Sequence, residues 1–117
     1  MYTVTSDEII NNVLNEVTRG VKDVYGSKLK EVVLYGSYAI GKNDDESDID
    51  LMVLVDAEES ELRNYDKQLN RIISDIGYRY IKVISLVDMS YEKFYNWVDA
   101  IPFYMNVKNE GIVIYEQ

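Results

Sequence analysis

Hydrophobic residues recur at helical spacing in the first part of the chain. Thr5 and Glu8 stand three residues apart ahead of this pattern, as in a capping box, and Gly26-Ser27 follows it. The spacing therefore predicts a helix from about Thr5 to Tyr25. One face of that helix carries the apolar side chains Ile9, Ile10, Val13, Leu14, Val17, Val21 and Val24.

Two apolar runs after this helix predict strands. Residues 31–35 (EVVLY) are rich in β-forming residues, and residues 48–55 (DIDLMVLV) are almost continuously apolar after their first three positions. A strand of the second kind is typically covered on both faces. Between the two runs, SYAIG predicts a small turn or helix and KNDDES a polar loop.

The rest of the chain continues the alternation of helices and strands. We expect a second long helix from a cap at Asp56 to Gly77, then a third strand over residues 78–87. Ser90 is expected to cap a short aromatic helix, and residues 102–110 to form another that ends at Gly111, before a last strand, IVIYE. The inner stripe of the long helix would be Leu62, Tyr65, Leu69, Ile72, Ile73 and Ile76. This order predicts one α/β domain over residues 1–117.

Composition narrows the chemistry that is available. The sequence contains no cysteine and no histidine, which excludes disulfides, thiolate or imidazole zinc sites and histidine-activated nucleophiles. It shows neither a signal-peptide pattern nor an apolar run that approaches the roughly 18 residues of a membrane span. We therefore expect a cytoplasmic protein without a membrane partner.

The chain is strongly acidic, with a net charge of −9. Duplex nucleic acid is a poor partner for such a surface, because its affinity comes mostly from neutralised phosphates. A polymerase or a tRNA-adding enzyme is disfavoured for the same reason. Small anions can still bind where backbone N–H groups or a metal ion override the overall charge.

Two carboxylates stand at the start of the second predicted strand. Side chains alternate along a strand, so Asp48 and Asp50 point the same way, about 6.6 Å apart along the chain. Oxygen ligands at this spacing suit one Mg²⁺ or a pair of metal ions that clamp a phosphoryl transfer. Gly36-Ser37 follows the neighbouring strand, where a glycine lets the backbone approach a phosphate and the hydroxyl and following N–H groups can bind it.

The stretch GSYAIGKNDDESDIDLMVLV closely resembles the signature of the DNA polymerase β-like nucleotidyltransferase superfamily, in particular its minimal nucleotidyltransferase members. Their pattern is a strand, Gly-Ser, about ten residues, Ser-Asp-hydrophobic-Asp and a hydrophobic strand. The matching positions are Gly36, Ser37, Gly41, Ser47, Asp48, Ile49, Asp50 and Leu51. The C-terminal PFYMNVKNEGIVIYE is similar to the end of such proteins, so the resemblance extends loosely to the whole chain.

The resemblance implies a palm-like α+β fold, in which helices pack on a mixed sheet. It also implies that Asp48 and Asp50 bind Mg²⁺, as a two-metal site, and that Gly36 and Ser37 hold a nucleoside triphosphate. Transfer of AMP from ATP to a hydroxyl is the activity that it implies. Small members are often antitoxins that adenylylate a tyrosine of a helical HEPN partner, and a homo-oligomer is compatible with the same features.

The sequence departs from this family at two places. A third carboxylate is usual on a later strand, and our register puts Ser85 there, a hydroxyl that is an inefficient base. Asp88 lies on the opposite parity and would serve as a helix cap or turn residue before Ser90. Ile40 replaces a common arginine, and Lys42 is either a phosphate contact or a solvated loop residue.

These departures leave two functions open. The first is an active Mg²⁺-dependent nucleotidyltransferase that acts on a protein or small-molecule hydroxyl. The second is a degenerate member that binds a nucleotide or its protein partner without catalysis. The aromatic stretch from Tyr91 to Tyr104 likewise has two interpretations, a flap over the sheet or a partner surface.

Overall fold

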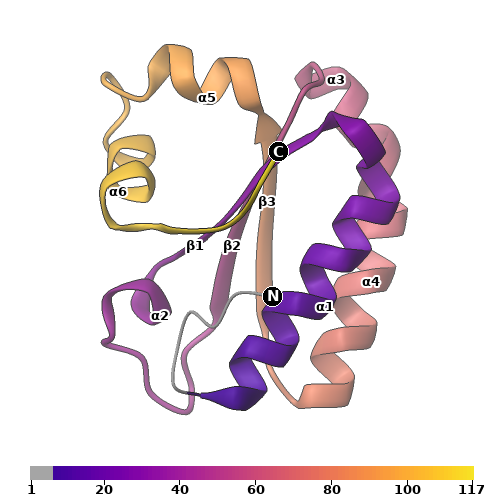
Figure 1. The fold of residues 1–117 in the computed structure, drawn as a ribbon, viewed down its shortest axis with the longest axis vertical. Helices are drawn as coiled ribbons and strands as arrows, with labels where there is room; N and C mark the ends of the chain where they lie inside the picture. The colour runs from indigo at the N-terminus through magenta and orange to yellow at the C-terminus, as the bar shows by residue number, and fades with distance from the viewer. Residues whose placement is uncertain (1–6) are drawn as a thin grey trace.

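The structure, a computed structural model, describes residues 7–117 and has a four-stranded sheet between two layers of helices (Figure 1). The strand order is β3-β2-β1-β4. β1 runs antiparallel to β2 and β4, whereas β2 and β3 are parallel. The predicted α+β fold with a mixed sheet is therefore confirmed. The strands are β1 (Leu29–Tyr35), β2 (Ile49–Val55), β3 (Ile84–Ser90) and β4 (Ile112–Glu116).

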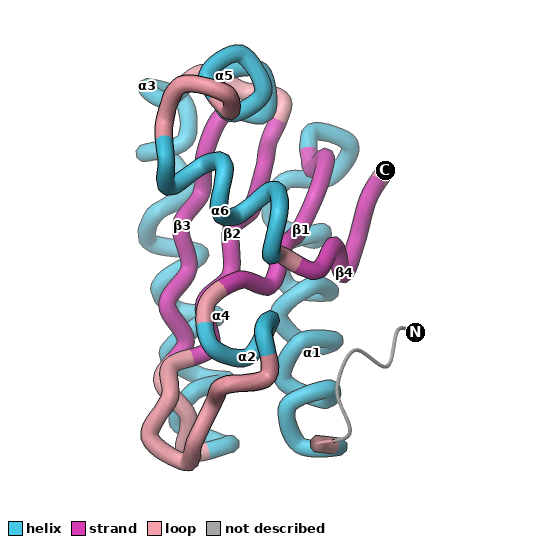
Figure 2. The backbone as a smooth tube through the Cα atoms, turned by 90° about the vertical axis from the view of Figure 1, so that its left-hand side faces the viewer, coloured by secondary structure: helices cyan, strands magenta, loops and turns pink. Residues whose placement is uncertain are grey.

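The helices divide between the two faces of the sheet. α1 (Glu8–Tyr25) and α4 (Asp66–Tyr80) cover one face, on the right in Figure 1. α2 (Ser37–Ile40), α5 (Tyr91–Trp97) and α6 (Pro102–Glu110) lie on the other face, and Figure 2 shows α2 and α6 in front of the strands. Each side has its own apolar cluster, so β2 is buried on both faces as its sequence predicts. No helix in residues 7–117 is long and apolar enough to cross a membrane.

The first helix begins at Glu8. Asp7 is its N-cap, and the Asp7 carboxylate accepts hydrogen bonds from the backbone N–H groups of Ile9 and Ile10. The predicted cap, Thr5, lies outside the described residues. Five side chains of the predicted stripe are buried, Ile10, Val13, Leu14, Val17 and Val21, and Tyr25 joins them, whereas Ile9 is exposed and Val24 is only partly buried.

The predicted long helix from Asp56 to Gly77 is wrong in its first part. A single turn, α3 (Glu59–Leu62), and a 3₁₀ turn (Arg63–Tyr65) precede α4, and Glu58 rather than Asp56 stands at the N-cap. The Asp56 N–H instead donates to Lys28 O, which ties the end of β2 to the start of β1. The 3₁₀ turn brings the Tyr65 ring to 4.9 Å from that of Tyr25, so packing against α1 breaks the helical period.

The end of α4 also differs from the prediction, and so does the start of β3. Gly77 lies inside the helix, where it allows the Lys82 carbonyl to approach, since a Cβ on Gly77 would lie 2.8 Å from that oxygen. The helix continues to Tyr80, and Ile81 takes the left-handed position beyond it. Residues 78–80 are therefore helical despite their β-forming composition, and the strand predicted for residues 78–87 runs over 84–90.

The C-terminal elements follow the prediction closely. Ser90 caps α5, because its Oγ accepts a hydrogen bond from the Lys93 N–H. α6 ends before Gly111, and β4 covers the residues expected of the last strand. Phe94 and Tyr104 are buried against the sheet, so this segment is a flap. Tyr91 is partly buried, whereas Tyr95, Trp97 and Phe103 are exposed.

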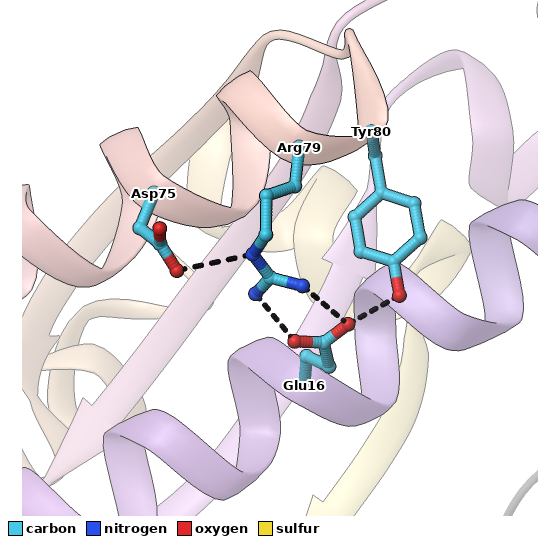
Figure 3. A network of polar contacts seen from close by, with 4 residues as sticks. All are labelled: Glu16, Asp75, Arg79 and Tyr80. Carbon is cyan, nitrogen blue, oxygen red and sulfur yellow. Dashed lines mark hydrogen bonds and ion pairs between the residues drawn. The ribbon is translucent and has the colours of Figure 1, made fainter.

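A polar network joins the C-terminal end of α4 to α1 (Figure 3). The Arg79 guanidinium donates to both carboxylate oxygens of Glu16, at 2.6 and 3.3 Å, and to Asp75. The Tyr80 hydroxyl donates to the same Glu16 carboxylate. Hydrogen bonds from Arg79 and Tyr80 lower the pKa of Glu16, so this carboxyl stays ionised and fixes the last turn of α4 on α1.

Candidate active site at the start of β2

Two carboxylates lie at the end of the sheet where β2 begins. Asp48 is exposed just before the strand, and Asp50 is half-buried within it. Burial raises the pKa of Asp50, and the negative charge of Asp48 raises it further. A cation between the two side chains would favour their ionised forms, and would therefore offset both contributions to the raised pKa of Asp50. The pair also fits Mg²⁺ in number, since Mg²⁺ in proteins is usually bound by one or two carboxylates together with phosphate oxygens and water.

The turn after β1 brings the backbone against Asp50. Tyr35 pairs with Asp50 in the antiparallel register, so Gly36 lies beside its carboxylate. Gly36 has φ 73° and ψ −156°, a region that is essentially restricted to glycine. A Cβ there would overlap Asp50 Oδ2 and lie 3.2 Å from Asp50 Cγ. Ser37 follows as the first residue of α2, so the structure brings Gly36, Ser37 and Asp50 together as the motif predicts.

Ser85 lies next to this site on the edge strand. It is paired with Asp50 in the parallel register of β2 and β3. Its neighbours of the same parity, Val87 and Met89, pack under α5 and α6, and so does Met52 of β2. Ser85 therefore faces the same side of the sheet as Asp50.

Asp88 faces the opposite side, as its parity predicts. Its carboxylate accepts a hydrogen bond of 3.0 Å from the Tyr25 hydroxyl on α1. It sits inside β3 rather than in a cap or turn, so that part of the prediction is wrong. In residues 7–117, no group of three His, Cys, Asp or Glu side chains is arranged to hold a metal ion. Lys42 is exposed after α2, where its N–H donates to Ser37 O.

Two aromatic residues that are not part of the motif border the site. Tyr35 lies opposite Asp50, and burial raises the pKa of its hydroxyl, with a smaller contribution from the Asp50 charge. The Phe103 ring, from the first turn of α6, stands edge-on to Tyr35 at 5.6 Å. The alternation of side chains along β1 could have predicted that Tyr35 borders the site. The position of Phe103 could not be predicted in this way, because it depends on how α6 folds back onto the sheet.

A comparison with protein families matches this arrangement. The sequence profile of the family described as "Nucleotidyltransferase domain" covers residues 14–112, which includes both carboxylates and the Gly36-Ser37 turn. The chain belongs to this family. The membership that the motif predicts is therefore confirmed.

Relatives and solved structures resemble this nucleotidyltransferase over most of its length. A protein of Methanocaldococcus jannaschii, whose name provisionally assigns it as a protein adenylyltransferase, is 30% identical over 87% of this chain and 94% of its own. A chain of a toxin–antitoxin crystallised with AMP-PNP superposes with TM-score 0.58 at 19% identity, covering 88% of this chain and 73% of that chain. The complex of a tri-AMPylated Shewanella oneidensis HEPN toxin with an MNT antitoxin gives TM-score 0.54 at 16% identity, covering 92% and 72%. The two structural matches show a shared fold.

The half-buried carboxylate of Asp88, on the other face of the sheet, gives a prediction about stability. Burial raises the pKa of Asp88 above its ordinary 3.8, and the charges of Asp66 and Glu59 act in the same direction against the hydrogen bond from Tyr25. The folded protein then holds this proton to a higher pH than the unfolded chain does, so stability falls as pH rises through that window. Asp88→Asn keeps an acceptor for Tyr25 without the charge. We expect a higher Tm than wild type at pH 7.

The measurement is the Tm difference between the two proteins from pH 4 to pH 8. The gain is expected to shrink as pH falls towards 4, because Asp88 then takes up a proton in the folded state and begins to do so in the unfolded chain. Asp45→Asn, in the exposed loop before β2, is the matched control, and no comparable gain is expected from it. A Tm of Asp88→Asn that is lower at pH 7, or a gain that does not vary with pH, would contradict this interpretation.

Proposed function

We propose that this nucleotidyltransferase transfers AMP from ATP to a hydroxyl of a protein in a Mg²⁺-dependent reaction. The observation that carries the proposal is the convergence of Asp48, Asp50 and the Gly36-Ser37 turn at one end of β1 and β2. In the reaction the acceptor oxygen bonds to the α-phosphorus, and the bond from that phosphorus to the bridging oxygen breaks. Pyrophosphate leaves and the hydroxyl proton is released.

Each part of the site has a role in this reaction. Asp48 and Asp50 would hold the metal, which supplies positive charge that offsets the charge of the triphosphate. Gly36 lets the backbone pass close to the bound phosphates, and the Ser37 hydroxyl can donate a hydrogen bond to one of them. Most of the rate enhancement would then come from positioning and charge compensation, as is general for phosphoryl transfer.

The names of the relatives support a protein as the acceptor. The curated relative is provisionally a protein adenylyltransferase, and one structural neighbour is a complex that contains a tri-AMPylated HEPN toxin. We infer that the acceptor is a tyrosine of a HEPN-type helical partner, for which this chain would be the antitoxin. The direct test is to incubate the purified chain with labelled ATP, Mg²⁺ and such a partner and to measure label on the partner.

A second function is favoured by one specific observation. Ser85 occupies the position opposite Asp50 where the family usually has a third carboxylate, and no other acid in residues 7–117 completes a three-carboxylate site. A chain with this site can bind a nucleotide or its partner and transfer AMP slowly or not at all. Stable complex formation without label transfer would support this binding module.

Ser85→Asp separates the two functions. If Ser85 marks the place of a missing base or metal ligand, the aspartate is expected to raise the rate of AMP transfer at least about tenfold, since a positioned base contributes on the order of 10²–10⁴-fold. Ser85→Asn has the same shape without the charge and is the matched control. The rate is measured with labelled ATP at saturating Mg²⁺. Equal rates for both variants would rule out a missing carboxylate at this position.

A further inference from the structure

Three apolar side chains are exposed together where α4 gives way to β3. Tyr78 is 86% exposed, Ile81 89% and Val83 64%. With Gly77 and Lys82 they line an open hollow of about 400 Å³. We call Tyr78, Ile81 and Val83 the apolar platform. A contiguous exposed group of this kind, rather than single scattered residues, is typical of an interaction site.

The backbone at the platform is held in an unfavourable conformation. Ile81 has φ 55° and ψ 50°, and it is the only non-glycine residue with a positive φ in the described part of the chain. This left-handed region disfavours a β-branched side chain, and asparagine or glycine would occupy it at lower cost. An isoleucine here gains no burial in return, since its side chain is almost fully exposed. The fold thus offers no stabilising reason for this residue.

Hydrogen bonds also hold the platform in place. The N–H groups of Ile81 and Lys82 both donate to Gly77 O, which closes the turn against the helix. Arg79 and Tyr80, between the exposed residues, are tied to Glu16 of α1 (Figure 3). A surface that is already ordered loses little conformational entropy when a partner binds.

The platform adjoins the candidate active site. The Ile49 N–H, one residue after Asp48, donates to Val83 O at 2.9 Å. Val83 has the same parity on this segment as Ser85, the partner of Asp50. The turn before β3 and the loop before β2 lie at the same end of the sheet in Figures 1 and 2. A polypeptide docked on the platform would therefore lie at the same end of the sheet as the carboxylates.

Charge and shape restrict what can occupy this surface. The loop that leads into Asp48 carries three exposed acids, Asp44, Asp45 and Glu46, which favours basic groups on the occupant. A second copy would bring another net charge of −9 against the same loop, and nucleic acid would be repelled likewise. Side chains that protrude, rather than line an enclosed cavity, also suit a macromolecular surface better than a small molecule.

We propose that the apolar platform docks the acceptor polypeptide, through a segment that joins apolar and basic side chains next to the hydroxyl that receives AMP. This inference rests on the proposed function, because it assigns the acceptor surface of that same reaction. Ile81 and Tyr78 would make the main apolar contacts with this segment. The acidic loop, Asp44, Asp45 and Glu46, would attract its basic side chains at the edge of the platform. The platform would set affinity for the acceptor without any part in binding the nucleotide.

The test uses Ile81→Asn and Tyr78→Ser in the full chain. Asparagine tolerates the left-handed conformation, so Ile81→Asn is expected to keep or raise the Tm while it removes the apolar side chain. Ile9→Asn is the matched control, an identical replacement of a 52% exposed isoleucine on α1. The probe is a fluorescein-labelled peptide with one tyrosine flanked by leucine and arginine, together with a version in which serine replaces leucine. N-acetyltyrosinamide serves as an acceptor too small to span the platform and the site.

We expect wild type and Ile9→Asn to bind the leucine peptide alike. Both platform variants are expected to lose affinity at least about tenfold, as is usual for interface anchors. AMP transfer to N-acetyltyrosinamide and ATP binding are expected to stay unchanged. The inference is overturned if the variants bind like wild type, if no version binds the leucine peptide, or if the serine peptide binds equally well. A wild-type dimer that Ile81→Asn converts to a monomer would also overturn it, in favour of self-association.

The outcomes separate this inference from the proposed function. AMP transfer to the leucine peptide that is insensitive to Ile81→Asn would retain the function and remove the platform. Peptide binding that depends on Ile81, without AMP transfer to any acceptor, would retain the docking surface and overturn the catalytic proposal in favour of a binding module.

Discussion

Asp50→Asn is expected to reduce AMP transfer by on the order of 10³-fold or more, because it removes a negatively charged ligand of the metal ion that would offset the charge of the triphosphate. Asparagine preserves the shape of the side chain beside Gly36, so the geometry of the turn is retained. Asp48→Asn is expected to act in the same direction. Since Asp50 is half-buried next to Asp48, a neutral amide there is not expected to lower the Tm.

Two readouts test this expectation independently. Transfer is followed with labelled ATP, and metal binding is followed with Mn²⁺ by electron paramagnetic resonance, which does not depend on turnover. Asp45→Asn removes the same charge from the exposed loop three residues before Asp48 and is expected to leave Mn²⁺ binding and transfer to N-acetyltyrosinamide near wild type. Mn²⁺ affinity and transfer that survive in both Asp48→Asn and Asp50→Asn would refute the assignment of these carboxylates as the metal site.

The arrangement around Asp50 was predictable because it depends on local rules. Alternation along a strand puts Asp48 and Asp50 on one face, and strands that are apolar throughout must be covered on both sides. The same parity rule put Ser85 on the face of the site and Asp88 on the opposite face, and in the structure Ser85 pairs with Asp50. The parity rule gives the face on which each strand position lies, and the sequence gives the residue at that position.

The region from Asp56 to Val83 was harder to predict because tertiary contacts decide it. Residues 78–80 have β-forming side chains, yet the hydrogen bonds of Arg79 and Tyr80 to Glu16 keep them in the last turn of α4. Glycine normally marks a helix C-terminus, but Gly77 instead makes room for the Lys82 carbonyl. No local pattern predicts a left-handed isoleucine, so the platform could be recognised only in three dimensions.

Gly36→Ala is expected to produce the other large effect, on both stability and transfer. Its conformation, φ 73° and ψ −156°, costs a residue with a Cβ on the order of 1–3 kcal/mol. The added Cβ would also overlap the Asp50 carboxylate, so either the turn or Asp50 must move. Because a small displacement of catalytic groups can cost on the order of 10²-fold in rate, we expect at least that loss of AMP transfer.

Gly41→Ala separates strain from the clash at Asp50. Gly41 has the same φ of 73°, but a Cβ there would meet nothing within 4 Å. It is therefore expected to lower the free energy of unfolding by about 1 kcal/mol, from the left-handed conformation alone, and to leave transfer near wild type. Unfolding in urea and transfer of labelled AMP measure the two effects side by side. If both alanine variants lose transfer equally, flexibility of the whole turn from β1 through α2 matters, and close approach of Gly36 to Asp50 is not the cause.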